Sequence, residues 1–491
     1  MNQRWFCGWR RPHRQNCYLQ AKRRRLAILL ISSSLLTSYS VFSQTPSKST
    51  AAFRKQAQLL MEQGRVEDSL PLLQQAVAAN PRDVQTNLLL GRTLQQIGRI
   101  PEAIAAYKTI LRVEPANQAA ALGLSSAYRT VFNYKQAEIV LRRAMRAHPR
   151  DAEPAVALGE LEMQLQHYDS AIAVLKRAVA LAPANTAALR DLGICYQLTG
   201  KSELALNNFN RAVRLGPRSA AAYYFRAKFF ADSNQNENAE RDARKVLALE
   251  PENTPASLLL AKVLLRSGGC AEAKKLLEPL SDREQEGPRQ KPDTQNASRT
   301  EELFQLARAY DCLKQHELAR ATRAKFDELS HREEAARSAR SDADHIAEQA
   351  GELARQNQLA PALQLLEQAL QKDPENAAAH AQMAKINFSR GDVTGARVEI
   401  EAALRSRPYH PEFLYVLGRV MEKQGDDQRA LQAFQQTVLI DPREADAYYE
   451  IAQIHSRLGH QAEAVQALKS ALQISPDDPD YRRALATLTN R

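Results

Sequence analysis

The stretch ALAPANTAALRDLGICYQ, from Ala180 to Gln197, contains a proline, a short polar break and then an apolar pattern typical of a helix. The proline of this stretch recurs at a fixed spacing along the chain. Because only 22 of the 491 residues are proline, the shared register indicates a repeated structural unit. The prolines form two runs in which neighbours are 34 residues apart: Pro81, Pro115, Pro149, Pro183, Pro217 and Pro251, then Pro374, Pro408, Pro442 and Pro476.

Two positions of the repeat carry small side chains in every regular unit. With the proline as position 32, position 8 holds Gly, Ala or Ser, as in Gly193 and Ala227, and position 20 holds Ala or Ser, as in Ala205 and Ala239. Larger apolar residues at positions 7, 11 and 24 give the spacing of amphipathic helices. Small residues in fixed register indicate where two helices approach most closely, since a larger side chain would force them apart.

Glycine or asparagine at position 15 separates the two helices of most units. Gly98, Gly200 and Asn234 stand there, and both residue types tolerate the left-handed backbone that ends a helix. The proline ends the second helix because it lacks an N–H and disfavours helix in the residue before it. We therefore expect each unit to be a helix, a tight turn, a second helix and a stop, with the next unit stacked on it.

These small, apolar and proline positions resemble the tetratricopeptide repeat family, whose unit is also 34 residues long. The resemblance covers residues 50–283 and about 343–478, and EELFQLARAYDCLKQHELARATRAKF (301–326) looks like a degenerate unit between them. The resemblance implies an all-α fold, a right-handed α-solenoid of about twelve helix-turn-helix repeats in two arrays.

The domain organisation that we expect follows from these ranges. A final helix would cover the apolar face that a solenoid exposes at its end. The expected segments are a signal peptide or N-terminal anchor (1–43), a first array of about seven repeats (44–280), a polar linker (281–300), a degenerate repeat with a charged helical extension (301–342), a second array of four repeats (343–478) and a capping helix (479–491).

The N-terminal segment has the features of an export signal. AKRRR is followed by the apolar run LAILLISSSLLTSYSVFS, and Val41 and Ser43 fit the small-residue rule for a cut before Gln44. The alternative is an uncleaved anchor in the inner membrane through residues 26–42, although the strongly apolar part is shorter than the roughly 20 residues that span a bilayer. We expect an exported protein, periplasmic or secreted, that contacts the membrane only if this segment is uncleaved.

The formal charge of +11 does not indicate nucleic-acid binding. Residues 1–43 hold eight basic residues and no acidic one, so the rest of the chain carries only +3. A nearly neutral surface with interspersed charges lacks the basic patch that binds phosphates. We therefore expect no nucleic-acid partner.

The sequence contains no signature of catalysis, metal binding or cofactor binding. It lacks the phosphate-binding GxxxxGK[ST] and GxGxxG motifs, the zinc motif HExxH and the nucleophile motif GxSxG, and its ten histidines are scattered. After the leader, Cys195, Cys270 and Cys312 are widely spaced and include no CxxC pair, so we expect neither a disulfide framework nor a zinc site. We expect a protein that is not an enzyme and uses no cofactor.

In the tetratricopeptide repeat family, the first helix of each unit lines a concave groove that holds a peptide or another protein. The resemblance implies that positions 2, 5, 9 and 12 face this groove. Aromatic and basic side chains there suit an extended peptide with acidic or C-terminal groups; the alternative is a solvated helix face that only keeps the protein soluble. The candidate protein-binding residues are Arg190, Tyr224, Lys228 and Lys262 in the first array, and Lys385, Tyr415, Arg419 and Tyr449 in the second.

We expect an exported scaffold or adaptor that binds proteins or peptides in its concave groove. Two alternatives stay open: an accessory component of an envelope secretion or exopolysaccharide-assembly machine, and a regulatory part of a transferase. Repeats that run to within about fifteen residues of the C-terminus leave no room for a separate catalytic domain, which rarely has fewer than about 50 residues.

Overall fold

A computed structural model describes residues 50–281 and 292–489, so the expected signal or anchor lies outside the described residues. Within the described part of the chain there are 24 helices and no strand. The helices before residue 282 are α1 (Thr50–Glu62), α2 (Val66–Ala79), α3 (Val84–Gln96), α4 (Ile100–Val113), α5 (Gln118–Thr130), α6 (Tyr134–Ala147), α7 (Glu153–Gln164), α8 (Tyr168–Leu181), α9 (Thr186–Leu198), α10 (Ser202–Leu215), α11 (Ala220–Asp232), α12 (Asn236–Leu249), α13 (Thr254–Arg266) and α14 (Cys270–Ser281).

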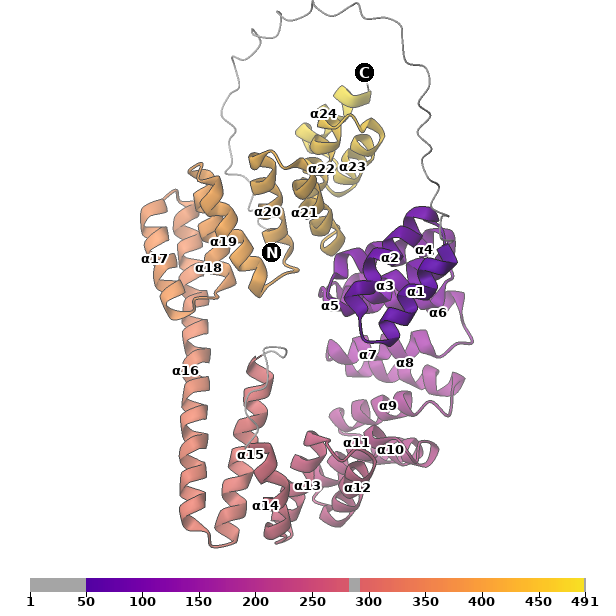
Figure 1. Cartoon of the computed structure of the whole chain (residues 1–491), viewed down its shortest axis with the longest axis vertical. Coiled ribbons are helices and arrows are strands. Elements are labelled where there is room, and N and C mark those ends of the chain that lie inside the picture. The colour runs from indigo at the N-terminus through magenta and orange to yellow at the C-terminus, as the bar shows by residue number, and fades with distance from the viewer. Residues whose placement is uncertain (1–49, 282–291, 490–491) are drawn as a thin grey trace, which may run out of the picture.

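The remaining helices follow residue 291. Together with the first fourteen they pack as antiparallel pairs in chain order, so the predicted all-α solenoid is confirmed (Figure 1). They are α15 (Pro292–Cys312), α16 (His316–Arg355), α17 (Leu359–Lys372), α18 (Ala377–Ser389), α19 (Val393–Ser406), α20 (Pro411–Gln424), α21 (Asp427–Ile440), α22 (Ala445–Arg457), α23 (Gln461–Ile474) and α24 (Pro479–Thr489).

Helix α16 is a single helix of 40 residues that serves two units. Its first part pairs with α15, and its last part pairs with α17 and also contacts α18. The charged stretch 327–344 lies inside it, and this stretch contains neither proline nor glycine to end a helix. Helix α15 begins at Pro292, so residues 292–300 of the expected linker are helical.

The small residues of the repeat lie where the two helices of a unit touch. A Cβ atom on Gly193 in α9 would come within 2.7 Å of the Phe209 ring in α10, and one on Gly418 would come within 2.5 Å of the Phe434 ring. Ala205 is fully buried in the same contact. Position 8 therefore stays small because the large residue at position 24 fills the space above it.

The helix ends also follow the repeat. Gly200 and Gly425 have φ angles of 75° and 83°, the left-handed conformation predicted for position 15. The residue two positions after the proline caps the following helix. The Asn185 side chain accepts a hydrogen bond of 2.9 Å from the Ala188 N–H, and Asn253 does the same for Ala256.

One expectation about the cysteines was wrong. Cys270 and Cys312 form a disulfide, with their Cα atoms 6.1 Å apart. Cys270 is the first residue of α14 and Cys312 is the last residue of α15. Because these two helices pack against each other and run in opposite directions, the start of one lies beside the end of the other. Cys195 is a free, buried cysteine, as expected.

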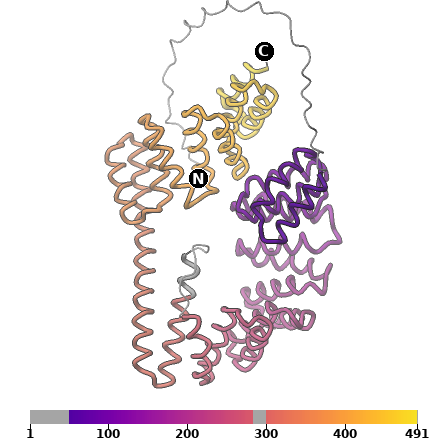
Figure 2. Tube along the Cα trace, viewed as in Figure 1, coloured from indigo at the N-terminus to yellow at the C-terminus, as the bar shows by residue number. Residues whose placement is uncertain are grey.

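The solenoid curves until its second array meets its first, and the described chain forms a closed ring (Figures 1 and 2). Tyr409, in the loop before α20, donates a hydrogen bond of 2.6 Å from its hydroxyl to the Gly98 carbonyl. Asn133 Nδ2 donates to the Ile440 carbonyl. Leu414 and Ile440 are buried in the apolar core around α3 to α6. Apolar packing and hydrogen bonds therefore both hold the two arrays together.

Candidate functional site

The first helices of the units form the inner face of the curve. In Figure 1, α5, α7, α9 and α13 lie nearer the centre of the ring than their second helices do. First helices of neighbouring units also contact each other directly, as α9 and α11 do. Side chains bridge them on this face: Arg129 pairs with Glu160 at 3.2 Å, and Gln197 donates to Asp232 at 3.0 Å. This inner face is the candidate groove.

In the first array, a basic residue and two aromatic rings lie together across α9 and α11. The Arg190 guanidinium lies 5.6 Å from the centre of the Phe225 ring, which is close enough for a cation–π contact. The Tyr224 ring packs edge-on against the Phe225 ring at 5.4 Å. Arg190 Nε also donates to Asp191 at 2.7 Å, so the guanidinium is held from two sides.

The other predicted residues of this array have different surroundings. Tyr224 is half-buried, and burial, followed by the charge of Asp232, raises the pKa of its hydroxyl. Lys228 is exposed one helical turn further along α11. Lys262 forms an ion pair of 2.7 Å with Glu301 of α15. Burial opposes ionisation of Glu301, but the hydrogen bonds from Lys262 and Gln305 outweigh it and lower the pKa of this carboxyl.

We define the first groove cluster as Arg190, Tyr224, Phe225, Lys228 and Lys262. Phe225 was not among the predicted residues, because position 6 of the repeat had not been assigned to the groove. The run of three aromatic residues at 223–225 was a signal that could have identified it, since such a run cannot be buried entirely on one side of a helix.

The two predicted tyrosines of the second array are buried. Tyr415 is 5% exposed and its ring lies 5.5 Å from the Phe434 ring. Tyr449 is 9% exposed and its ring lies 5.2 Å from the Tyr481 ring. Burial raises the pKa of the Tyr415 hydroxyl well above its ordinary value, and the charge of Glu450 acts in the same direction. Both rings belong to the apolar core and offer little surface to a partner.

The two basic residues of the second array are neutralised by acids. Lys385 forms an ion pair with Glu412. Arg419 forms ion pairs of 3.4 Å with Glu450 and 3.7 Å with Glu422, and it lies 5.9 Å from the Phe388 ring. An acidic peptide would have to displace these carboxylates. Arg419 and Tyr415 therefore lie in contact, and both basic residues of this array are already paired with carboxylates.

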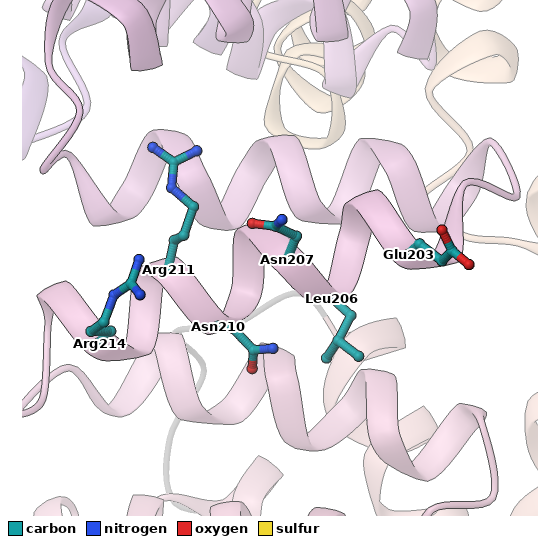
Figure 3. Close-up of a pocket in the computed structure, with 6 residues that line it drawn as sticks. All are labelled: Glu203, Leu206, Asn207, Asn210, Arg211 and Arg214. Carbon is teal, nitrogen blue, oxygen red and sulfur yellow. The ribbon is translucent and has the colours of Figure 1, made fainter.

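A shallow depression of about 430 Å³ lies beside α10, a second helix of the repeat (Figure 3). All its lining residues come from this one helix, so it brings together no groups from different elements. They are Glu203, Leu206, Asn207, Asn210, Arg211 and Arg214.

Within residues 50–281 and 292–489, no group of three or more His, Cys, Asp or Glu residues is arranged to hold a metal ion. None of the described helices combines the length and the apolar character needed to cross a membrane.

Several solved structures are similar to parts of this chain. A tetratricopeptide repeat protein from Parabacteroides merdae is 18% identical, covers 52% of this chain and 98% of its own, and has a TM-score of 0.42. PilF of Pseudomonas aeruginosa is 19% identical, covers 41% and 93%, and has a TM-score of 0.37. YrrB, described as having an unusual peptide-binding site, is 24% identical, covers 38% and 95%, and has a TM-score of 0.30. None of these likenesses bears on what this chain binds.

No curated protein matches this chain at a significant level. Family models do match it. One tetratricopeptide repeat model matches residues 60–128, 162–229, 230–291 and 353–420, which together exceed half of the chain. A second tetratricopeptide repeat model matches residues 417–489. Because these matches cover more than half of the chain, the chain belongs to the tetratricopeptide repeat family.

Proposed function

We propose that the chain is a non-catalytic scaffold that binds a protein or peptide on its inner face, at the first groove cluster. The observation that carries this proposal is the stacking of Arg190 over Phe225, with Tyr224 against the same ring. These three residues join two neighbouring first helices, α9 and α11, into one surface. Tyrosine and arginine are the residue types that most often dominate binding energy at protein interfaces.

The charges around this surface favour a partner with an acidic group. Lys228 is exposed beside the aromatic pair, and among the described residues no carboxylate forms an ion pair with it. A carboxylate of the partner could reach Lys228 without displacing an acid of the chain. Lys262, by contrast, already pairs with Glu301. Lys228 is therefore the residue at which we expect the partner's acidic group.

A photo-reactive phenylalanine analogue introduced at Ala221, an exposed residue one helical turn before Phe225 on α11, tests this proposal and leaves Lys228 in place. Cells carrying this variant are irradiated, and the cross-linked products are identified by mass spectrometry. The matched control places the same analogue at Lys245, an exposed residue of the second helix α12. We expect a discrete cross-linked partner from position 221 only, and at least a tenfold loss of that product when Phe225 is also changed to Ala. Equal products from both positions, or no effect of Phe225→Ala, would refute the groove.

We also propose that the protein is exported to an oxidising compartment, the periplasm or the exterior. The basic and apolar leader supports this, and the Cys270–Cys312 disulfide adds an independent argument. Disulfides persist in exported proteins and are rare in the reducing cytosol. Fractionation with thiol labelling tests it: we expect the pair to be oxidised in the exported fraction and reduced when residues 1–43 are deleted. A reduced pair in the native protein would contradict export.

A further inference from the structure

A second cavity lies on the outer face of the ring, away from the first groove cluster. It has a volume of about 320 Å³ and lies between α4 and α6, the second helices of two neighbouring units, with α5 behind it. Much of its lining is apolar and includes Leu111, Leu124 and Val140. Ile139 also lines the cavity, and its side chain is 48% exposed.

Three basic side chains line this apolar cavity. Lys108 and Arg112 are four residues apart on α4 and so lie on the same face of that helix, and Arg143 comes from α6 on the opposite side. Among the described residues, none of the three forms an ion pair with a carboxylate. Glu114 is the acidic residue nearest to Arg112 in the sequence, but its carboxylate accepts a hydrogen bond of 2.7 Å from the Asn117 side chain.

Lys108 differs from the comparable lysines of the chain. Four lysines in the described ranges are half-buried, and three of them pair with a glutamate: Lys262 with Glu301, Lys274 with Glu278 and Lys385 with Glu412. The ammonium of Lys108 instead lies 5.7 Å from the centre of the Tyr128 ring. Burial, followed by the charge of Arg112, lowers the pKa of Lys108. A half-buried cation beside a second cation is stabilised when an anion joins them.

We propose that this cavity binds a carboxylate attached to a short apolar body, with Lys108, Arg112 and Arg143 around the carboxylate and the apolar lining around the body. Two sources have this chemistry: the C-terminal residue of a peptide that ends in an aliphatic side chain, and a free short-chain carboxylic acid. The volume is sufficient for one such group and too small for a folded segment. This cavity is separate from the inner-face groove, and the proposal for it does not depend on the proposed function.

Fluorescence anisotropy of the full chain with a labelled Ala-Ala-Leu tripeptide tests the site. A neutral dye on the N-terminus is used, and the peptide is compared as its free acid and as its C-terminal amide. We expect the acid to bind at least tenfold more tightly than the amide. Lys108→Met keeps the aliphatic stem but removes the charge, and we expect it to lower the affinity for the free-acid peptide tenfold. Lys176→Met, at an exposed site of α8, is the control and should leave that affinity unchanged.

Competition distinguishes the two sources of the carboxylate. Unlabelled Ala-Ala-Leu and octanoate are each titrated against the bound labelled peptide. If Ala-Ala-Leu displaces it at the lower concentration, the natural ligand is a peptide C-terminus. If octanoate does so, the natural ligand is a free carboxylic acid. Displacement by inorganic phosphate as readily as by either would overturn the apolar part of the proposal. Equal affinities for acid and amide would overturn the whole of it, as would an unchanged affinity of Lys108→Met. Arg143→Gln provides a second variant should Lys108→Met fold poorly, with the same expected loss.

Discussion

The hydroxyl of Tyr409 donates a hydrogen bond of 2.6 Å to the main-chain carbonyl of Gly98, 311 residues earlier in the chain. This bond joins the loop before α20 to the turn between α3 and α4. Tyr409→Phe removes the donor and leaves the ring in place. A hydrogen bond of this kind contributes about 1 kcal/mol, so we expect amide exchange near Gly98 to accelerate about fivefold as the closure opens more often. Tyr168→Phe, at a half-buried tyrosine of α8, is the control and should change nothing there.

Glu444 makes the second array sensitive to pH. Burial, followed by the charges of Asp446, Asp441 and Glu412, raises the pKa of this carboxyl from 4.5 to about 7. The folded chain therefore holds this proton more tightly than the unfolded chain does. The stabilisation is complete below about pH 4.5 and is lost as the pH rises to about 7.

Glu444→Gln removes this titration. We expect the variant to be more stable than the parent at pH 8 and to lose the dependence on pH between 5 and 7, measured by amide exchange in α22. Glu463→Gln, at an exposed residue of α23, is the control. If the stability of the parent and of Glu444→Gln depended on pH in the same way, another group would be responsible for the titration.

The disulfide fastens α14 to α15. The loop it closes spans 42 residues, and closing a loop of that length stabilises a protein by about 3–4 kcal/mol in the chain-entropy model. We expect Cys270→Ser with Cys312→Ser to lower the stability of α13 to α15 by that order, seen as faster exchange there. Cys195→Ser tests whether the loss is specific, since it removes a thiol outside the bridge. Exchange that increases equally in all units would argue against a local role.

Replacing glycine with alanine is expected to have opposite effects on stability at two positions of the chain. A Cβ on Gly193 would meet the Phe209 ring at 2.7 Å, whereas one on Gly351 would meet only the flexible amide of Gln382, at 3.2 Å. We expect Gly193→Ala to destabilise the chain by about 1–3 kcal/mol through overpacking. Gly351→Ala should stabilise it by about 0.5–1 kcal/mol, because alanine favours the helix. Chemical denaturation followed by circular dichroism measures both, and two changes of the same sign would contradict the packing argument.

Phe132 occupies the turn position that glycine holds in most units. Its φ angle is 60° and its side chain is 65% exposed, so the ring gains little from burial while the backbone is strained. Phe132→Gly should raise the free energy of unfolding by about 1 kcal/mol. Lys314→Gly, at a φ of 59° in the equivalent turn before α16, should act in the same direction. Destabilisation by both would show that the turns are not strained.

The repeat was predictable because few positions decide it. Gly193 and Ala205 had to be small for two helices to touch, and that requirement is visible wherever the register holds. The disulfide was hidden because Cys312 lies in the degenerate unit, where the register fails. The closure of the ring was hidden for another reason: Tyr409 and Gly98 belong to different units, and no repeat position is reserved for contacts between distant units.

The site was less predictable than the fold. Position 5 was assigned to the groove by resemblance, yet it holds Leu88, Leu122 and Val156 in other units, and this apolar character already indicated partial burial. Tyr415 and Tyr449 follow that rule. The acids that neutralise Lys385 and Arg419 come from neighbouring helices, so they could be seen only once the helices were placed.

Helix α16 has a mechanical consequence. At about 1.5 Å per residue, its 40 residues form a rod about 60 Å long. Because one end completes the unit of α15 and the other completes the unit of α17, the rod fixes the distance between the two stacks. Its buried residues lie toward its two ends, Ala319 and Thr322 in the first unit and Ala343 to Gly351 in the second. A break in the largely exposed stretch between them would therefore leave each stack its own paired helix and remove only the spacer that joins them.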